Sequence, residues 1–107
     1  MIRPNDYFSR IFCINLARRA DRWAHVEEQC RRWGLQVERF EGYDQIVDDD
    51  GRVNGNCGCT ASHRALLEVI AYHRWPRVLI LEDDFEVCVP DFTDRFAGMI
   101  GEVPEDW

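Results

Sequence analysis

The chain has 107 residues, 46% of them hydrophobic and 31% charged, which is enough for one compact domain with its own core and too few for two. Residues 1–107 are therefore predicted to form a single folded domain rather than a disordered segment. Twenty acidic residues against thirteen arginines give a formal net charge of −7, whereas a duplex-binding protein is expected to have the opposite balance, so nucleic acid is excluded as a partner.

The first part of the chain predicts a strand, a helix and a second strand. Residues 11–16 form a nearly continuous apolar run, which is typical of a central strand covered on both faces. A helix is predicted from Asp21, a suitable N-cap, to Gly34, where a C-terminal glycine belongs. Its apolar positions recur at helical spacing: Trp23, Val26, Cys30 and Trp33. Residues 35–40 begin with alternating apolar and polar side chains and predict the second strand, which ends near Gly42.

The middle of the chain predicts a loop, a helix and a third strand. Residues 45–58 are rich in Asp, Asn and Gly, which is typical of a long loop. A helix follows, with Thr60 or Ser62 available to cap its start and Pro76 to end it. Its apolar face is predicted at four positions: Leu66, Val69, Ile70 and His73. Residues 78–81, with the sequence Val-Leu-Ile-Leu, predict the third strand.

The last part of the chain predicts an extended segment and a final helix. Residues 85–89 alternate apolar with polar or small side chains, so the chain is expected to stay extended until Pro90. Asp91 can cap a helix that Gly101 ends. The apolar side of this helix is predicted at Phe92, Phe96, Met99 and Ile100.

The order of these elements predicts the fold class. Strands and helices alternate along the chain, which indicates an α/β fold with a mostly parallel sheet and helices on both faces. Such sheets bind ligands just beyond the carboxyl ends of their strands. Residues that follow the predicted strands are therefore the first candidates for a binding site.

Hydropathy and cysteine usage indicate the compartment. The longest apolar run, residues 78–81, is far shorter than the roughly 20 residues of a membrane span. Residues 1–6 lack the apolar segment of a secretion signal, so a cytoplasmic protein without a membrane span is expected. Cys13, Cys30 and Cys88 fall at predicted core positions, which favours small buried hydrophobes over disulfides.

Three acids, Glu82, Asp83 and Asp84, directly follow the third strand. Adjacent carboxylates repel one another, so a hard divalent cation with oxygen ligands is their natural partner. In an extended backbone Glu82 and Asp84 face one side and Asp83 the other, although Asp84 and Glu86 offer an alternative same-side pair. The competing interpretation is a solvated strand end where one acid caps a turn. The flanking apolar segments favour the metal site.

Three arginines, Arg18, Arg19 and Arg22, follow the first strand at the start of the first helix. The helix dipole disfavours each cation there by about 0.3–1 kcal/mol, so a compensating group is expected. A bound diphosphate is one such group, because guanidinium groups match phosphate oxygens and the helix N-terminus adds backbone donors. A salt bridge from Asp21 to Arg18 or Arg22 is an alternative of similar weight.

Cys57, Cys59 and His63 place three soft metal ligands within seven residues. A structural zinc site needs four ligands, and no second Cys/His pair lies at a customary spacing, so the sequence disfavours zinc. Ser62 and His63 do not make a nucleophile and base pair, because adjacent helical residues point in different directions. Asp44 follows the second strand, where an acid can accept hydrogen bonds from a ribose.

Four ordered blocks together resemble glycosyltransferase family 25, the lipopolysaccharide-type galactosyltransferases related to the collagen galactosyltransferases. The blocks are Ile14-Asn15-Leu16-x-Arg18-Arg19-x-Asp21-Arg22, Glu38-Arg39-Phe40 leading to Asp44, Gly58-Cys59-x-x-Ser62-His63 with Ala65-Leu66, and Leu79-Ile80-Leu81-Glu82-Asp83-Asp84. Each block alone is modest in specificity. Their order and spacing across almost the whole chain carry the resemblance.

The resemblance implies the nucleotide-binding half of a GT-A-like (Rossmann-like) domain. The implied activity is that of a metal-dependent, inverting glycosyltransferase of lipopolysaccharide or cell-surface glycan biosynthesis. It would transfer a hexose, with galactose expected, from a UDP-sugar donor to a saccharide acceptor. Mn²⁺ or Mg²⁺ is the implied cofactor, with Glu82 and Asp84 as its ligands. The implied nucleotide-sugar-binding residues are Asn15, Leu16, Arg18, Arg22, Asp44, Ser62, His63 and Asp83.

Two features depart from the family pattern. The family usually has Asp-Gly after the second strand, whereas Gln45 follows Asp44 here. The family's catalytic domain also continues well past residues 103–107, so neither a general base nor an acceptor site is identified in this chain. The alternative function is therefore a non-catalytic module that binds a nucleotide-sugar or a metal. A half-domain with an uncovered sheet edge is also expected to favour a homodimer.

Overall fold

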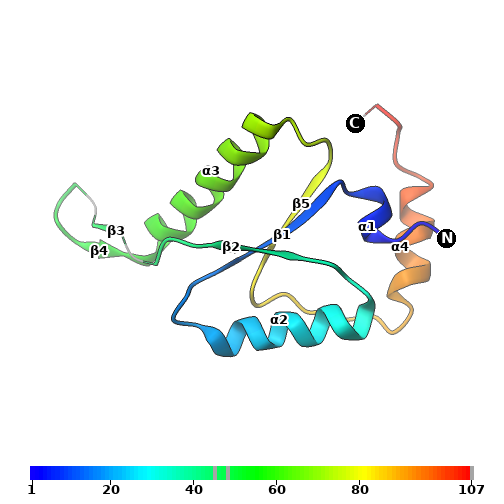
Figure 1. Ribbon diagram of the computed structural model, residues 1–107, viewed down its shortest axis with the longest axis horizontal. Coiled ribbons are helices and arrows are strands. Elements are labelled where there is room, and N and C mark those ends of the chain that lie inside the picture. The colour runs from blue at the N-terminus through cyan, green and yellow to red at the C-terminus, as the bar shows by residue number, and fades with distance from the viewer. Residues whose placement is uncertain (45, 48, 107) are drawn as a thin grey trace.

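The computed structural model describes residues 1–44, 46–47 and 49–106, without the side chains of residues 46–47 and 53–57. Gln45 and the side chain of Cys57 therefore lie outside the described residues. The elements in chain order are α1 Pro4–Tyr7, β1 Arg10–Asn15, α2 Ala20–Trp33, β2 Glu38–Glu41, β3 Ile46–Val47, β4 Val53–Asn54, α3 Gly55–His73, β5 Val78–Glu82 and α4 Phe92–Ile100 (Figure 1). The chain has the predicted α/β organisation.

The main sheet has three parallel strands in the order β2-β1-β5, and β3 and β4 form a separate antiparallel pair. Phe12 of β1 lies opposite Glu38 of β2 and Ile80 of β5. The central position of β1 explains its apolar sequence, because Ile11, Phe12 and Cys13 are at most 6% exposed. A strand covered on both faces needs such a continuous apolar run.

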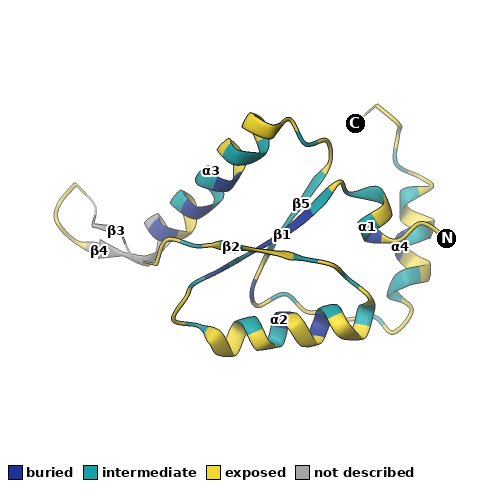
Figure 2. Ribbon diagram, viewed as in Figure 1, coloured by how far each residue is buried: buried dark blue, intermediate teal, exposed yellow. Residues whose placement is uncertain are grey.

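Helices cover both faces of this sheet, as the sequence predicts. In Figure 1, α2 and α3 lie on opposite sides of the strands. Neighbouring side chains of a strand point to opposite faces, and β1 shows the consequence. Ile11 shares an apolar pocket with Phe92 and Phe96 of α4, whereas the Phe12 ring lies 5.5 Å from the ring of Trp75, which follows α3. Figure 2 shows the buried residues gathered along β1 and on parts of α2 and α3.

The ends of α2 confirm one predicted signal and correct another. Gly34 adopts a left-handed conformation with φ of 66°, and its N–H donates to the carbonyl of Cys30. Only glycine enters this region without a steric penalty, so its place just after the helix is confirmed. The predicted N-cap is wrong, because Arg19 occupies that position and Asp21 lies inside the first turn. There Asp21 still benefits from the helix dipole.

The prediction of a loop over residues 45–58 is wrong, because regular elements occupy both the beginning and the end of this range. The range contains β3 and β4, and α3 begins at Gly55. Thr60 and Ser62 therefore lie inside α3 rather than at its cap. The Ser62 hydroxyl, 1% exposed, donates to the carbonyl of Gly58 and accepts a hydrogen bond from the N–H of Tyr43, both at 2.8 Å. It ties the helix to the segment after β2 instead of starting the helix.

The segment 85–89, which is expected to stay extended, pairs with no strand of the described sheets. The chain turns after β5, where the N–H of Phe85 donates to the carbonyl of Glu82. The segment is then held by two side chains of α2. His25 donates to the carbonyl of Phe85 at 2.7 Å, and the N–H of Val87 donates to Gln29 at 3.0 Å. Gln29 is itself buried, so this polar pairing replaces the hydrogen bonds of a strand ladder.

Smaller differences concern element lengths and individual side chains. The second strand is β2, Glu38–Glu41, which begins later than the predicted residue 35. Met99 is 59% exposed and does not join Phe96 in the core. Cys13 is buried as expected, but Cys88 is exposed. No helix in the described part of the chain has both the length and the hydropathy to cross a membrane.

Two helical glycines give a matched test of this packing. A Cβ at Gly58 would lie 2.4 Å from the carbonyl oxygen of Asp44 and 2.8 Å from that of Tyr43, whereas a Cβ at Gly98 meets no atom within 4 Å. We expect Gly58→Ala to lower the free energy of unfolding by about 1–3 kcal/mol, because backbone must move. Gly98→Ala should raise it by about 0.5–1 kcal/mol. Urea denaturation measures both, and equal stabilities would contradict the close approach.

Candidate ligand-binding pocket

A pocket of about 310 Å³ opens at the carboxyl ends of β1 and β5, which is the edge that the sequence predicts for ligands. Its lining residues are Ile14, Leu16, Arg18, Arg19, Arg22, Tyr43, Asp44, Cys59, Ser62, His63, Glu82, Asp83 and Asp84. They include every predicted site residue except Asn15, which contacts Asp83 directly. Two larger hollows, of about 560 and 580 Å³, lie along α2 and α3 and receive no residue from the strand ends.

Asp83 is the buried acid of the pocket, with 7% of its surface exposed. Asn15 Nδ2 donates to its Oδ2 at 2.8 Å, and Arg22 Nη1 donates to its Oδ1 at 3.2 Å. Both carboxylate oxygens are thus engaged by groups from β1 and α2. A buried carboxylate is tolerated only with such partners, so Asp83 holds the strand ends and the helix together.

Asn15 connects this carboxylate to the edge strand β2. Its Oδ1 accepts a hydrogen bond from Arg39 Nε at 2.9 Å, and its backbone carbonyl accepts another from Arg39 Nη2 at 3.2 Å. Its Nδ2 also donates to the carbonyl of Arg19. Asn15 is 2% exposed, so it acts as a positioning residue under the pocket rather than as part of its surface. Sequence reasoning did not assign Arg39 to the site, although the parallel pairing of β1 and β2 brings it here.

Each of the three arginines after β1 is paired with an acid. Arg22 contacts Asp83, Arg19 contacts Asp21, and Arg18 forms a two-pronged pair with Asp44 that includes an Nη2–Oδ1 contact of 2.9 Å. The predicted bridges from Asp21 to Arg18 or Arg22 are therefore replaced by Asp21 with Arg19. The Arg18–Asp44 pair is half exposed, and the guanidinium hydrogen bond holds the pKa of Asp44 below its usual value. A pair of this kind can exchange its acid for an incoming phosphate.

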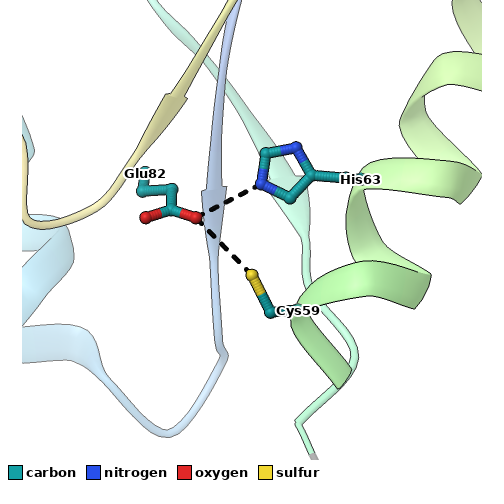
Figure 3. Close-up of side chains that lie close together, drawn as sticks. All are labelled: Cys59, His63 and Glu82. Atoms are coloured by element: carbon teal, nitrogen blue, oxygen red, sulfur yellow. Dashed lines mark hydrogen bonds and ion pairs between the residues drawn. The ribbon is translucent and has the colours of Figure 1, made fainter. Parts of the chain in front are cut away.

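Cys59 and His63 of α3 meet Glu82 at the end of β5 (Figure 3). The Cys59 thiol donates to Glu82 Oε1 at 3.5 Å, and His63 Nε2 lies 3.3 Å from the same oxygen. Partial burial and the hydrogen bond to Glu82 raise the pKa of the Cys59 thiol. Sequence reasoning placed His63 in the site but did not assign Cys59 to it. The signal was the four-residue spacing of Cys59 and His63, which puts both on one helical face.

The three consecutive acids have different surroundings. Glu82 and Asp84 are exposed, whereas Asp83 is buried. The chain turns at this point, so the extended backbone assumed for the acids is wrong. The Asp84 carboxylate forms no hydrogen bond or ion pair with the described part of the chain, so its oxygens are available to a ligand in the pocket. A fully solvated strand end is excluded by the burial of Asp83.

Comparison with known proteins gives one similarity. The human protein named inactive glycosyltransferase 25 family member 3 is 28% identical over an alignment of 126 residues, which covers 97% of this chain. The chain resembles the glycosyltransferase 25 family. It spans only 20% of that relative's length. No protein-family profile matches the chain, and no solved structure matches it.

Substitutions at Asp83 and Asp84 test the different surroundings of adjacent acids. Asp83→Asn removes the charge and sets an amide NH₂ against one of the two donors, Asn15 or Arg22, so we expect a loss of about 1–3 kcal/mol in the free energy of unfolding. Asp84→Asn should change this free energy by less than about 0.5 kcal/mol, because Asp84 is exposed. Urea denaturation of both variants measures the difference. Equal effects would contradict the assigned role of Asp83.

Proposed function

We propose that this chain is the donor-binding part of a glycosyltransferase and that its pocket binds a UDP-hexose, with UDP-galactose as the expected donor. The observation that carries the proposal is the convergence of arginines and carboxylates in one pocket at the carboxyl ends of β1 and β5. Similarity to a glycosyltransferase 25 family member supports a sugar donor and a saccharide acceptor as partners. In the family pattern the acceptor belongs to lipopolysaccharide or another cell-surface glycan.

The arginines suit the diphosphate of such a donor. Arg18, Arg19 and Arg22 all line the pocket, and α2 begins beside them at Ala20. Guanidinium groups bind phosphate oxygens in pairs, and the first turn of a helix adds backbone N–H donors. Asp44 lies at the same wall, where release from Arg18 lets it accept hydrogen bonds from a ribose. Ser62 and Leu16 line the pocket beside it.

The residues also fit a divalent cation. Asp83 is the less accessible acid, because it is buried and because Asn15 and Arg22 each donate a hydrogen bond to one of its oxygens. Glu82 and Asp84 are exposed carboxylates on the pocket wall, and carboxylate oxygens are the ligands that Mg²⁺ and Mn²⁺ prefer. We propose these two residues as its ligands. When bound, the ion would act as a Lewis acid that stabilises the departing diphosphate.

A second candidate function is donor binding without transfer. The similar human protein carries the word inactive in its name, and this chain spans a fifth of its length. An inverting transfer needs a general base within hydrogen-bond reach of the acceptor hydroxyl. In this candidate the chain binds the same donor and cation but does not catalyse the transfer.

Calorimetric titration with UDP and UDP-galactose tests donor binding. We expect binding that requires Mn²⁺ and that weakens at least about 10-fold in Asp84→Asn, because the variant loses a charged oxygen ligand. Asp94→Asn is the matched control, since Asp94 is an exposed acid on α4 and does not line the pocket. Binding without the ion, or equal binding by both variants, would refute the cation assignment.

The two candidate functions differ in one measurable product. In incubations with UDP-galactose and Mn²⁺, transfer gives UDP release that requires a saccharide acceptor, whereas hydrolysis of the donor gives UDP without one. Donor binding with acceptor-dependent UDP release supports the transferase. Donor binding without release supports the binding module, and absence of donor binding refutes both.

A further inference from the structure

Three side chains that line the pocket bring a sulfur, a nitrogen and an oxygen atom close together, and each of these atoms can bind a metal ion. The Cys59 thiol, the His63 imidazole and the Glu82 carboxylate place one ligand atom each within 4.8 Å of one another. Cys59 and His63 are four residues apart on α3, so they project from the same face one turn apart. Glu82 closes the triangle from the end of β5 (Figure 3).

The two separations from Glu82 agree with the edges of a metal tetrahedron. Zinc lies about 2.3 Å from a thiolate sulfur and about 2.0–2.2 Å from imidazole nitrogen or carboxylate oxygen. Tetrahedral angles then separate nitrogen from oxygen by about 3.3 Å and sulfur from oxygen by about 3.6 Å. The observed distances to Glu82 Oε1 are 3.3 Å from His63 Nε2 and 3.5 Å from Cys59 Sγ. Two of the three edges therefore match a zinc tetrahedron, and the third, between Cys59 and His63, is at most 4.8 Å.

From this geometry we infer that Cys59, His63 and Glu82 form a binding site for a borderline transition-metal ion such as Zn²⁺. One sulfur, one nitrogen and one oxygen ligand suit zinc, whereas Mg²⁺ and Ca²⁺ take oxygen ligands. Binding replaces the thiol proton, which leaves to solvent, with a sulfur–metal bond. Three protein ligands leave a fourth tetrahedral position for water or a ligand.

The site is open to an incoming ion. Cys59 and Glu82 are exposed, and the His63 side chain is 38% exposed. All three residues line the same pocket as Asp84, but Asp84 is not one of the three ligands. This inference therefore does not rest on the proposed donor binding. Glu82 is common to this site and to the proposed Mn²⁺ site, so Cys59 and His63 distinguish the soft site and Asp84 distinguishes the hard one.

Cobalt titration tests the site directly. Co²⁺ replaces zinc in such sites, and a thiolate ligand gives it a sulfur-to-metal charge-transfer band that oxygen and nitrogen ligands cannot give. We expect one equivalent of Co²⁺ to produce this band in the whole chain, kept reduced, and Zn²⁺ to remove it. Cys59→Ser should abolish the band. His63→Ala and Glu82→Gln should each weaken cobalt binding by more than about 10–100-fold, the loss typical of an outer-shell partner.

The chain supplies matched controls for each ligand. Cys88→Ser removes another exposed thiol, and His73→Ala removes another histidine of α3, so both should keep the band and the affinity. Asp84→Asn should also keep the band, although it weakens Mn²⁺-dependent UDP binding. Far-ultraviolet circular dichroism shows whether each variant is folded. A band that survives in folded Cys59→Ser, or that is lost equally in Cys88→Ser, would overturn the site.

Discussion

The arrangement at the carboxyl end of β5 depends on one buried carboxylate, that of Asp83, whose charge must be compensated by partners inside the protein. One oxygen of Asp83 accepts a hydrogen bond from Asn15 of β1, and the other accepts one from Arg22 of α2. Asn15 is in turn held by Arg39 of β2. A single charge thus links all three parallel strands to the first long helix, and a deletion at any of its partners leaves buried polar atoms unpaired.

This arrangement divides three adjacent acids between two roles. Asp83 stabilises the fold, because both of its carboxylate oxygens accept hydrogen bonds from side chains of the protein. Glu82 and Asp84 remain exposed at the pocket surface, where Glu82 contacts Cys59 and His63 and Asp84 forms no hydrogen bond with the described chain. Three arginines line the same pocket, each paired with another acid, so the pocket presents both signs of charge. A ligand with a diphosphate and an accompanying cation matches that distribution.

The local parts of the fold follow from the sequence. The apolar runs of β1 and β5 and the glycine after α2 are signals contained in a few adjacent residues. Contacts between distant parts of the chain do not follow from local sequence. The backbone of residues 85–89 is bound by His25 and Gln29, about 60 residues earlier, and no local pattern indicates this. Likewise the sequence suggests Ser62 as a helix cap, whereas in the structure its hydroxyl accepts a hydrogen bond from the N–H of Tyr43.

The candidate site was predictable to the extent that its residues follow strand ends. Parallel strands place their carboxyl ends at one edge, so the acids after β5 and the arginines after β1 were expected together. The pairing of each arginine and the approach of Cys59 to Glu82 were not, because they depend on how α2 and α3 are seated on the sheet. The spacing of Cys and His residues alone does not reveal Glu82, the third ligand of the inferred metal site, because Glu82 comes from a different element.

The Ser62 hydroxyl links two segments that line the pocket. It joins the carbonyl of Gly58 in α3 to the N–H of Tyr43 after β2 through one oxygen atom, and Gly58 has no side chain to keep these segments apart. Two walls of the pocket are therefore fastened to each other. The first turns of α3, which carry Cys59, are thus held directly against the segment that carries Tyr43 and Asp44.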